Sequence, residues 1–586
     1  MSERATTYRT HTCGELRAEH AGLSVKLSGT LHRKVSDKVF LVSDRSGQTL
    51  VALGPKSTGE LDKQAVDLAP RDLVYVEGSV VKRKTGSADT PTGDIWVSPT
   101  KVKLLCRPEP PPVDLDDEGL AFEERLRYRH LDLRRPSMQE RLALRTRVLL
   151  EVRKLLSQRG FLEVETPYLE SLSADAEGSL VVPARPGEVF ALPLRERLYS
   201  RLLMAGGFDR TFQIARCFRR PDRLRAGEQV EYTVLDLAAA FVALRDLLAL
   251  ADGVLKSLWS MLGQPELPVP VTQLSYDEAI TRFGTAQPDL RIDLTLLDVS
   301  EVVQAADGGP WKPASEADGG AYAVVLRGGS RERKDERLNG VVTDSEARAR
   351  ATVTWHGVEE EGSLSGPWAD EIPNGVASAL VAHTGVSAGD LLFVSAASQK
   401  RVAARGAGAV RTSVGERLGL LSGNPLSLVW VTGLPYLDYD ADQSDWVPVG
   451  SAFSLPHPDH ADLARSGEAR ETVRSQAVSL VLNGSVVGSG SIWSNDGDLV
   501  RSVAKLLGCD DDAVEDRYGT AVEAFQFGMP PHGGVAIDLD CIMAFGAGLN
   551  GPAEVIPFPK SPSGEDPLLS APCKIAVGQL RDLLEP

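Results

Sequence analysis

The sequence predicts a multidomain α+β protein whose chain begins with a small β-barrel. The first observation is length, because 586 residues exceed what one compact hydrophobic core normally contains. The second is a series of short alternating strands in the first hundred residues, and the third is a long amphipathic helix that follows them. With 42% hydrophobic and 25% charged residues, the composition excludes a disordered or collagen-like chain.

The N-terminal segment, residues 1–107, has the pattern of a barrel of the oligonucleotide-binding (OB) type. Apolar and polar residues alternate in five short runs, and turn-forming residues separate the runs. The runs are Val25–Leu31, Val39–Val42, Thr49–Ala52, Leu73–Val81 and Ile95–Val97. A five-stranded OB barrel is the predicted structure. A β-module that binds nothing has the same pattern and remains the alternative.

Residues 108–136 are predicted to form a hinge, because they begin with the proline- and acid-rich run PEPPPVDLDDE. Helices are expected at Glu123–Arg135 and at Met138–Arg159, where leucines and valines repeat at helical spacing. The second helix opens residues 137–270, the first part of a larger domain. A strand from Phe161 to Thr166 is expected to follow it.

The remaining boundaries come from shifts in composition. Residues 271–423 are rich in Gly, Ala and Thr and predict an inserted α/β module. Residues 424–586 return to strand-rich runs, among them SLVLNGSVVGSGSIW and GGVAIDLDCIMAF, with a helix at Asp498–Leu507. This segment is interpreted as the second part of the larger domain with a C-terminal extension.

Charge is distributed unevenly along the chain. The formal net charge is −17, but residues 1–107 carry 17 Lys and Arg against 12 Asp and Glu, a net charge of +5. Residues 195–225 contain nine arginines and three acids. Both basic stretches are suited to contact the phosphates of RNA, so the acidic total does not exclude a nucleic-acid partner. A solvated run of charges is the alternative for residues 195–225.

Cysteine spacing and hydropathy indicate the cellular compartment in which the protein is expected. The six cysteines are scattered without a CxxC pair, so a disulfide scaffold and a cysteine zinc site are not expected. No metal site is predicted. The N-terminus lacks an apolar signal region, and no run approaches 18 apolar residues, so a cytoplasmic protein with no membrane partner is expected.

Several motifs in collinear order resemble those of bacterial aspartyl-tRNA synthetases, a class II family. The motifs are THTCGEL near the start, LRYRHLDLRRP (126–136), RGFLEVETPYL (159–169), LLMAGGFDRTFQIARCFR (202–219), FGTAQPDLR (283–291), LVLNG (480–484), PPHGG (530–534) and FPK (558–560). The resemblance implies an anticodon-binding OB barrel, a class II antiparallel sheet with flanking helices, and the inserted module of the bacterial branch. It also implies a homodimer formed in part by the motif 1 helix and strand.

The resemblance further implies a two-step reaction. Aspartate attacks the α-phosphate of ATP, and the acyl group then passes from the adenylate to the 3′ end of tRNA. ATP and Mg²⁺ are therefore the expected cofactors, and tRNA and an amino acid are the expected partners. Such a reaction needs no protein nucleophile, because positioning and charge stabilisation carry it.

Three residues match the family's substrate-holding positions. Arg219, in CFR, matches the motif 2 arginine that contacts the α-phosphate or the substrate carboxylate. Glu177 and Asp236 stand where the family has the carboxylates that hold the substrate ammonium group. Surface carboxylates without a ligand are the alternative for these two.

The aspartate side-chain positions differ from the family pattern. Ser200 stands at the family's lysine and Trp493 at its arginine, so both cations expected to face the β-carboxylate are replaced. Without them a buried carboxylate is strongly disfavoured. Arg195 and Arg197 are new charges nearby, and Trp493 indicates a smaller or more apolar pocket.

The ATP and metal positions differ as well. The resemblance aligns Pro221 with the motif 2 acid, Ser479 and Val486 with the metal-binding carboxylates, and Cys541 with the motif 3 arginine. Asp538 replaces the glycine of that motif and would repel phosphate. These replacements argue against normal use of ATP and Mg²⁺.

Candidate contacts with tRNA are Phe40, Arg33, Arg223 and Arg225. Phe40 is a barrel aromatic that could stack on an anticodon base, with a core position as the alternative. The leading hypothesis is a tRNA- or amino-acid-binding pseudoenzyme. An active ligase, specific for aspartate or for another amino acid, is the second, and a structural partner of a true synthetase is the third.

Overall fold

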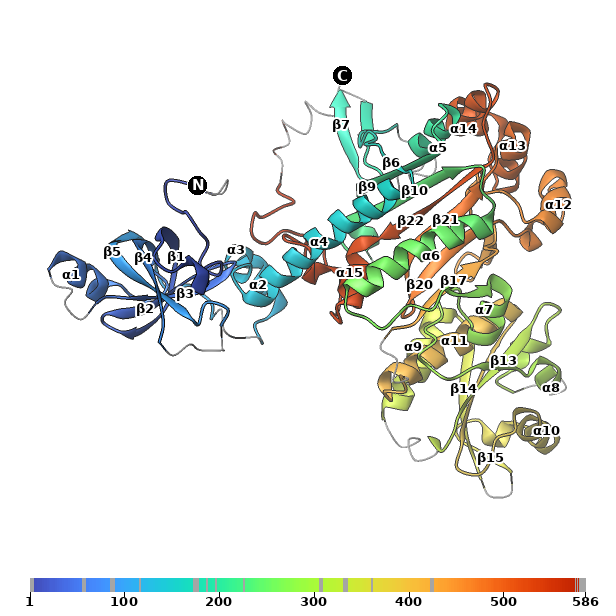
Figure 1. Cartoon of the computed structure of the whole chain (residues 1–586). Helices are drawn as coiled ribbons and strands as arrows, with labels where there is room; N and C mark the ends of the chain where they lie inside the picture. The colour runs from blue at the N-terminus through green and yellow to red at the C-terminus, as the bar shows by residue number, and fades with distance from the viewer. Residues whose placement is uncertain are drawn as a thin grey trace. The chain divides into compact units, whose positions relative to one another are not determined.

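The computed structural model divides into two compact units, Met1–Arg141 and Leu142–Pro586, and Figure 1 shows their elements. No helix of the described chain is both long and apolar enough to cross a membrane. The structure describes residues 5–54, 59–84, 90–114, 117, 119–171, 179–185, 188–194, 198–224, 227–304, 309–329, 336–359, 362–421, 426–574, 576 and 578.

The first unit contains the predicted barrel. Its closed strand order is β1-β2-β3-β5-β4, and each of the five predicted runs lies within an observed strand. Helix α1 (Glu60–Asp67) lies between β3 and β4 in the chain. The alternation of apolar and polar residues arises because every second side chain points into the barrel. The strands are β1 (Ser24–Ser36), β2 (Val39–Asp44), β3 (Gly47–Ala52), β4 (Leu73–Lys82) and β5 (Ile95–Cys106).

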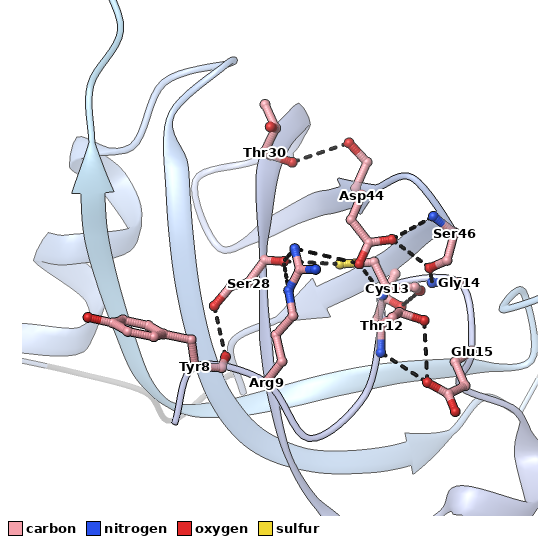
Figure 2. Close-up of polar contacts among 12 residues, drawn as sticks. Tyr8, Arg9, Thr12, Cys13, Gly14, Glu15, Ser28, Thr30, Asp44 and Ser46 are labelled. Carbon is pink, nitrogen blue, oxygen red and sulfur yellow. Dashed lines mark hydrogen bonds and ion pairs between the residues drawn. The ribbon is translucent and has the colours of Figure 1, made fainter. Parts of the chain in front are cut away.

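The motif THTCGEL and Arg9, which directly precedes it, form hydrogen bonds that hold the N-terminal segment on this barrel. The backbone amide of Cys13 donates to Asp44 Oδ2 at 2.9 Å, and Arg9 Nε donates to the carbonyl of Ser28 at 2.9 Å (Figure 2). Cys13 itself is fully buried, which raises the pKa of its thiol. A Cβ on Gly14 would lie 1.9 Å from the carbonyl oxygen of Ser46, so only glycine fits there.

Phe40 belongs to the interior of the barrel. Its side chain is 0% exposed and packs in the barrel's hydrophobic core, since alternate residues of β2 point inward. The prediction that Phe40 stacks on a base is therefore wrong, and the alternative core position is correct. Arg33, on β1, is exposed.

The motif LRYRHLDLRRP forms α2 (Phe122–Arg127) and α3 (Arg129–Asp132), followed by the start of α4 (Pro136–Gln158). The expected single helix is thus broken at Tyr128. The buried carboxylate of Asp132 forms ion pairs with Arg125, Arg129 and Arg135. This motif is therefore a structural charge cluster around one acid.

The second unit is built on an eight-stranded sheet in the order β11-β17-β20-β21-β22-β10-β9-β6, and the pairings from β17 to β9 are antiparallel. Strand β10 pairs with β22 although about three hundred residues separate them, so one sheet is made from both sides of the insertion. The strands are β6 (Leu162–Glu163), β9 (Arg210–Phe218), β10 (Glu231–Ala240), β11 (Thr272–Ser275), β17 (Leu428–Thr432), β20 (Ala477–Leu482), β21 (Ser485–Trp493) and β22 (His532–Asp538).

One face of this sheet is apolar and packs on helices. Leu235, Leu237 and Ile537 lie in a single buried cluster with side chains of α4, α6 (Leu244–Met261) and α15 (Leu539–Gly546), and Figure 1 shows α6 along the sheet. The run GGVAIDLDCIMAF is therefore strand only as far as Asp538. Its second half is helix α15.

The inserted residues form a second, five-stranded sheet in the order β12-β13-β16-β14-β15 with two hydrophobic clusters of its own. Strands and helices are thus both present between residues 276 and 417. The strands are β12 (Leu296–Asp298), β13 (Gly320–Leu326), β14 (Thr352–Val358), β15 (Leu364–Ser365) and β16 (Leu391–Ala397), and the neighbouring helices are α7 (Tyr276–Phe283), α8 (Ser300–Gln304), α9 (Glu336–Ala349), α10 (Asn374–Thr384) and α11 (Lys400–Arg417).

The other face of the eight-stranded sheet, called the site face below, carries polar residues. Part of it is covered by helices whose apolar side chains pack with Ala238, Ala240 and Trp493. The helix expected at Asp498–Leu507 is one of them. The elements at this side are α5 (Leu198–Ala205), α12 (Ala461–Ser466), α13 (Gly497–Leu506), α14 (Asp511–Phe525) and the two-stranded pairs β7 (Val181–Arg185) with β8 (Glu188–Ala191) and β18 (Leu437–Asp440) with β19 (Asp445–Pro448).

Candidate functional site

Strand register gathers the predicted site residues on the site face. Asp236 on β10 lies opposite Gln213 on β9 and Ala536 on β22, and Asp538 lies opposite Val234. Residues two apart on a strand share a face, so Asp236 and Asp538 point to the same side of the sheet. The part of the site face around Asp236 is called the amino-acid end below and the part around Asp538 the nucleotide end, after the ligands that the sequence analysis expects there.

Asp236 is held at the amino-acid end by a neutral partner. The hydroxyl of Ser200, on α5, donates to Asp236 Oδ2 at 2.7 Å, and the Asp236 side chain is buried. On the neighbouring strand, Gln213 Oε1 accepts hydrogen bonds from the backbone and hydroxyl of Thr166. Ser200 thus contacts the carboxylate directly, at the position where the resemblance places a lysine.

Trp493 packs over the neighbouring strand β22 and lies in one buried cluster with Ala238 of β10. A Cβ on Gly534 would lie 2.3 Å from Cη2 of Trp493, so the indole covers a glycine on the neighbouring strand. The ring also meets that of His532 edge-on, at 5.3 Å between centroids. The guanidinium carbon of Arg201 lies 4.9 Å from the Trp493 ring and 4.1 Å from that of Phe453. Arg201 is therefore sandwiched between two aromatic rings.

His532 is neutral in this environment. Burial, as the main cause, and the nearby charge of Arg201 lower the pKa of His532 to about 4, although the hydrogen bond to Pro530 acts in the opposite direction. Nδ1 of His532 donates to the carbonyl of Pro530 at 2.9 Å, which leaves Nε2 as the unprotonated nitrogen. The motif PPHGG thus supports the indole, with His532 beside it and Gly534 beneath it.

Arg219 lies at the nucleotide end. Its guanidinium carbon lies 3.5 Å from the centroid of the Tyr232 ring. Its Nε is 4.0 Å from Glu228 Oε1, and its Nη2 is 4.0 Å from Asp538 Oδ2. The arginine therefore packs on an aromatic ring and lies 4.0 Å from each of two carboxylates.

Asp538 joins β22 to α15. Its Oδ1 accepts a hydrogen bond from the backbone amide of Cys541 at 3.0 Å and so caps the helix. Burial, as the main cause, and the negative charge of Asp540 raise the pKa of Asp538 to about 6, although Arg219 and the amide of Cys541 act in the opposite direction. Burial and the same two acids raise the pKa of the Cys541 thiol, so Cys541 is neutral.

Asp540 has a structural position that sequence reasoning missed. It is fully buried, pairs with Arg145 of α4 and accepts a hydrogen bond from the backbone amide of Thr233 at 2.8 Å. Arg145 Nη2 also donates to the Thr233 hydroxyl at 2.7 Å. The available signal was an acid within the otherwise apolar run that begins α15.

The predicted metal positions supply no carboxylate. Ser479 lies on β20 and Val486 on the neighbouring strand β21, where Val486 is exposed. Pro221 packs against the turn at Gly564, whose added Cβ would lie 2.6 Å from Pro221 Cβ. Within the described residues, no three His, Cys, Asp or Glu side chains are grouped to hold a metal. These positions do not fit the expected Mg²⁺.

Several predicted residues cannot be placed. Arg223 ends a short 3₁₀ helix, Pro221–Arg223, but nothing is described of its side chain. The residues that lie outside the described part of the chain are Glu177, Arg195, Arg197 and Arg225.

Comparison with known proteins identifies the family. The model of the class II tRNA synthetases (D, K and N) matches residues 121–562, and the chain belongs to this family. The chain is 35% identical to the aspartate–tRNA ligase of Shouchella clausii over 98% of each chain. It is 37% identical to the aspartate–tRNA(Asp/Asn) ligase of Moorella thermoacetica, over 99% of this chain and 97% of that protein.

A solved structure supports the fold. The asparaginyl-tRNA synthetase of Pyrococcus horikoshii, crystallised with asparaginyl-adenylate, aligns with a TM-score of 0.57. The alignment covers 94% of this chain and 98% of that one, at 16% sequence identity. The predicted class II α+β fold with an N-terminal five-stranded barrel is thus confirmed.

Proposed function

We propose that this chain is an aspartyl-tRNA synthetase-like protein that binds an amino acid and tRNA but has lost normal ATP- and Mg²⁺-dependent activation of aspartate. The observation that carries this proposal is the surroundings of Arg219. Its single positive charge faces Glu228 and Asp538, each at 4.0 Å, and the neutral Cys541 stands at the second expected cation. Arg219 would therefore meet an ATP polyphosphate with its charge already opposed by two carboxylates.

The amino-acid end supports binding of an amino acid other than aspartate. Asp236 supplies a carboxylate suited to an ammonium group, and its partner Ser200 adds no charge. Trp493 presents an indole where the resemblance places an arginine, and Arg201 lies buried between aromatic rings. Because neither Ser200 nor Trp493 supplies a positive charge for a second carboxylate, a neutral side chain is the proposed ligand.

Binding of tRNA and dimer formation complete the proposal. Arg33 is exposed on the barrel, and Arg210, Arg216 and Arg220 lie along and just after β9.

Leu150 of α4 is 66% exposed and Leu162 of β6 is 50% exposed, which favours burial against a second copy. A cytoplasmic protein would meet tRNA directly.

An active ligase with altered amino acid specificity is the second candidate. It is favoured by identity of 35–37% to named aspartate–tRNA ligases over almost the whole chain. Arg219 and Asp236 are also both present on the site face. In that case Ser200 and Trp493 would select the amino acid, and ATP would displace Asp538 from Arg219.

Pyrophosphate exchange with each of the twenty amino acids separates the two candidates. We expect no ATP-dependent exchange with aspartate or any other amino acid, while calorimetry detects binding of a neutral amino acid. Exchange with aspartate would refute the proposal. Exchange with a single different amino acid would establish the second candidate instead.

A filter-binding measurement with bulk tRNA tests the RNA part. Affinity should fall as salt rises, because phosphate contacts release counterions. The substitution Arg33→Ala should weaken binding, whereas Arg245→Ala, which removes an exposed arginine on α6, serves as the matched control.

A further inference from the structure

We propose that Asp538 is a specificity-determining residue that excludes nucleotide phosphate, because its carboxylate takes the place of an external anion beside Arg219. This inference rests on the proposed function, since it explains how the site face loses ATP while the fold is kept. It assigns a separate part of that loss, the exclusion of phosphate from Arg219, to one side chain.

The position of Asp538 is fixed by the backbone. The residue ends β22, where it lies opposite Val234, and its Oδ1 caps α15 through the amide of Cys541 at 3.0 Å. The side chain is 11% exposed, so it has little freedom to turn away. Its second oxygen, Oδ2, is the one that lies 4.0 Å from Arg219 Nη2.

Arg219 is equally restricted. Its guanidinium lies over the ring of Tyr232, whose hydroxyl donates to the carbonyl of Leu194 at 2.7 Å. Glu228 lies 4.0 Å from its Nε. An incoming phosphate must therefore approach a cation whose charge two nearby acids oppose. Of these two acids, Asp538 lies on the strand face that Asp236 also occupies.

The neighbouring acid does not share this role. Asp540 pairs with Arg145 and accepts from the amide of Thr233, so its charge is satisfied within the fold. Asp538 is thus the carboxylate of this turn that is directed to Arg219. Replacing it should change the charge of the site without removing a buried ion pair.

The test is ATP binding to the full-length protein by calorimetry, with and without Mg²⁺. We expect Asp538→Asn to bind ATP at least tenfold more tightly than the wild type, since asparagine retains the helix cap but not the charge. Asp538→Ser, which also caps, should behave alike. Asp510→Asn is the matched control, because Asp510 caps α14 in the same way and is exposed.

The outcomes separate this inference from the proposed function. If the folded Asp538 variants bind ATP no better than the wild type, the inference is wrong, although absence of exchange would leave the proposed function intact. If both variants fail to fold, the carboxylate is structural and the inference is also wrong. Wild-type exchange with aspartate would instead overturn the proposed function itself.

Discussion

The two ends of the site face differ in the charge of the side chains that contact their central charged residue. At the amino-acid end a carboxylate, Asp236, is met by the neutral hydroxyl of Ser200. At the nucleotide end a cation, Arg219, is met by Glu228 and Asp538. Both ends lie on the same sheet, so the scaffold does not decide what each binds. The scaffold is therefore shared, and the side chains around each charged group differ: a neutral hydroxyl contacts the carboxylate at one end, whereas two carboxylates oppose the cation at the other.

The largest expected effect separates the two acids at the start of α15. Asp540→Ala should lower the free energy of unfolding by about 3–5 kcal/mol, because it leaves the Arg145 charge buried without its partner. Asp538→Asn should change it by less than about 1 kcal/mol, since the ionised Asp538 is itself disfavoured by burial. Urea unfolding of both variants measures the contrast. Equal losses would mean that both acids are structural.

The amino-acid end should respond to acid through His532. Its pKa of about 4 in the folded protein lies below the unfolded value of 6.5, so the unfolded chain takes up the proton first. The contribution of His532 to the free energy of unfolding is fully present above pH 6.5. It falls by up to about 3 kcal/mol as the pH drops to 4. His356, also with a pKa near 4, adds a similar loss in the inserted module.

The variant His532→Gln tests this assignment. The difference in unfolding free energy between pH 7 and pH 4.5 should shrink relative to wild type, while the contribution of His356 stays. An unchanged pH dependence would show that His532 is not buried as a neutral group. The measurement is urea unfolding at the two pH values.

Removal of the ammonium partner should have a smaller effect. Asp236→Asn should weaken amino acid binding about 10- to 100-fold, the usual value of one charged hydrogen bond. Ser200→Ala should weaken it less, because the carboxylate remains. Calorimetry with the bound amino acid measures both. Unchanged affinity in both variants would place the ligand elsewhere.

The smallest expected effect is a change in ligand preference. The double variant Ser200→Lys with Trp493→Arg should raise affinity for aspartate by about tenfold, since it supplies cations for a second carboxylate. Ser200→Met with Trp493→Leu fills similar volume without charge and is the control. Higher affinity for aspartate in both double variants would indicate a steric cause and not an electrostatic one.

Local periodicity explains which parts of the fold could be predicted. The barrel strands follow from alternation with period two, which needs only neighbouring residues. The same alternation did not reveal which face of β2 points inward, so Phe40 was misassigned. The end of β22 at Asp538 was missed because the cap depends on one side chain within an apolar run.

Residues of the candidate site could be predicted only where they stand at a position of a family motif. Arg219, Asp236, Ser200 and Trp493 do lie on or beside the site face. The pair Arg145–Asp540 spans 395 residues, and no local pattern links the two. The aromatic sandwich around Arg201 likewise joins elements that are far apart in the sequence.

The pairing of β10 with β22 has a consequence for biosynthesis. At about 5–20 residues per second, the roughly three hundred residues between them take about 15–60 s to translate. During that time β10 presents an open strand edge, which is prone to pair with other chains. The inserted module has hydrophobic clusters of its own and can therefore fold before β22 is translated. Nascent chains should therefore depend on chaperones until the last hundred residues emerge.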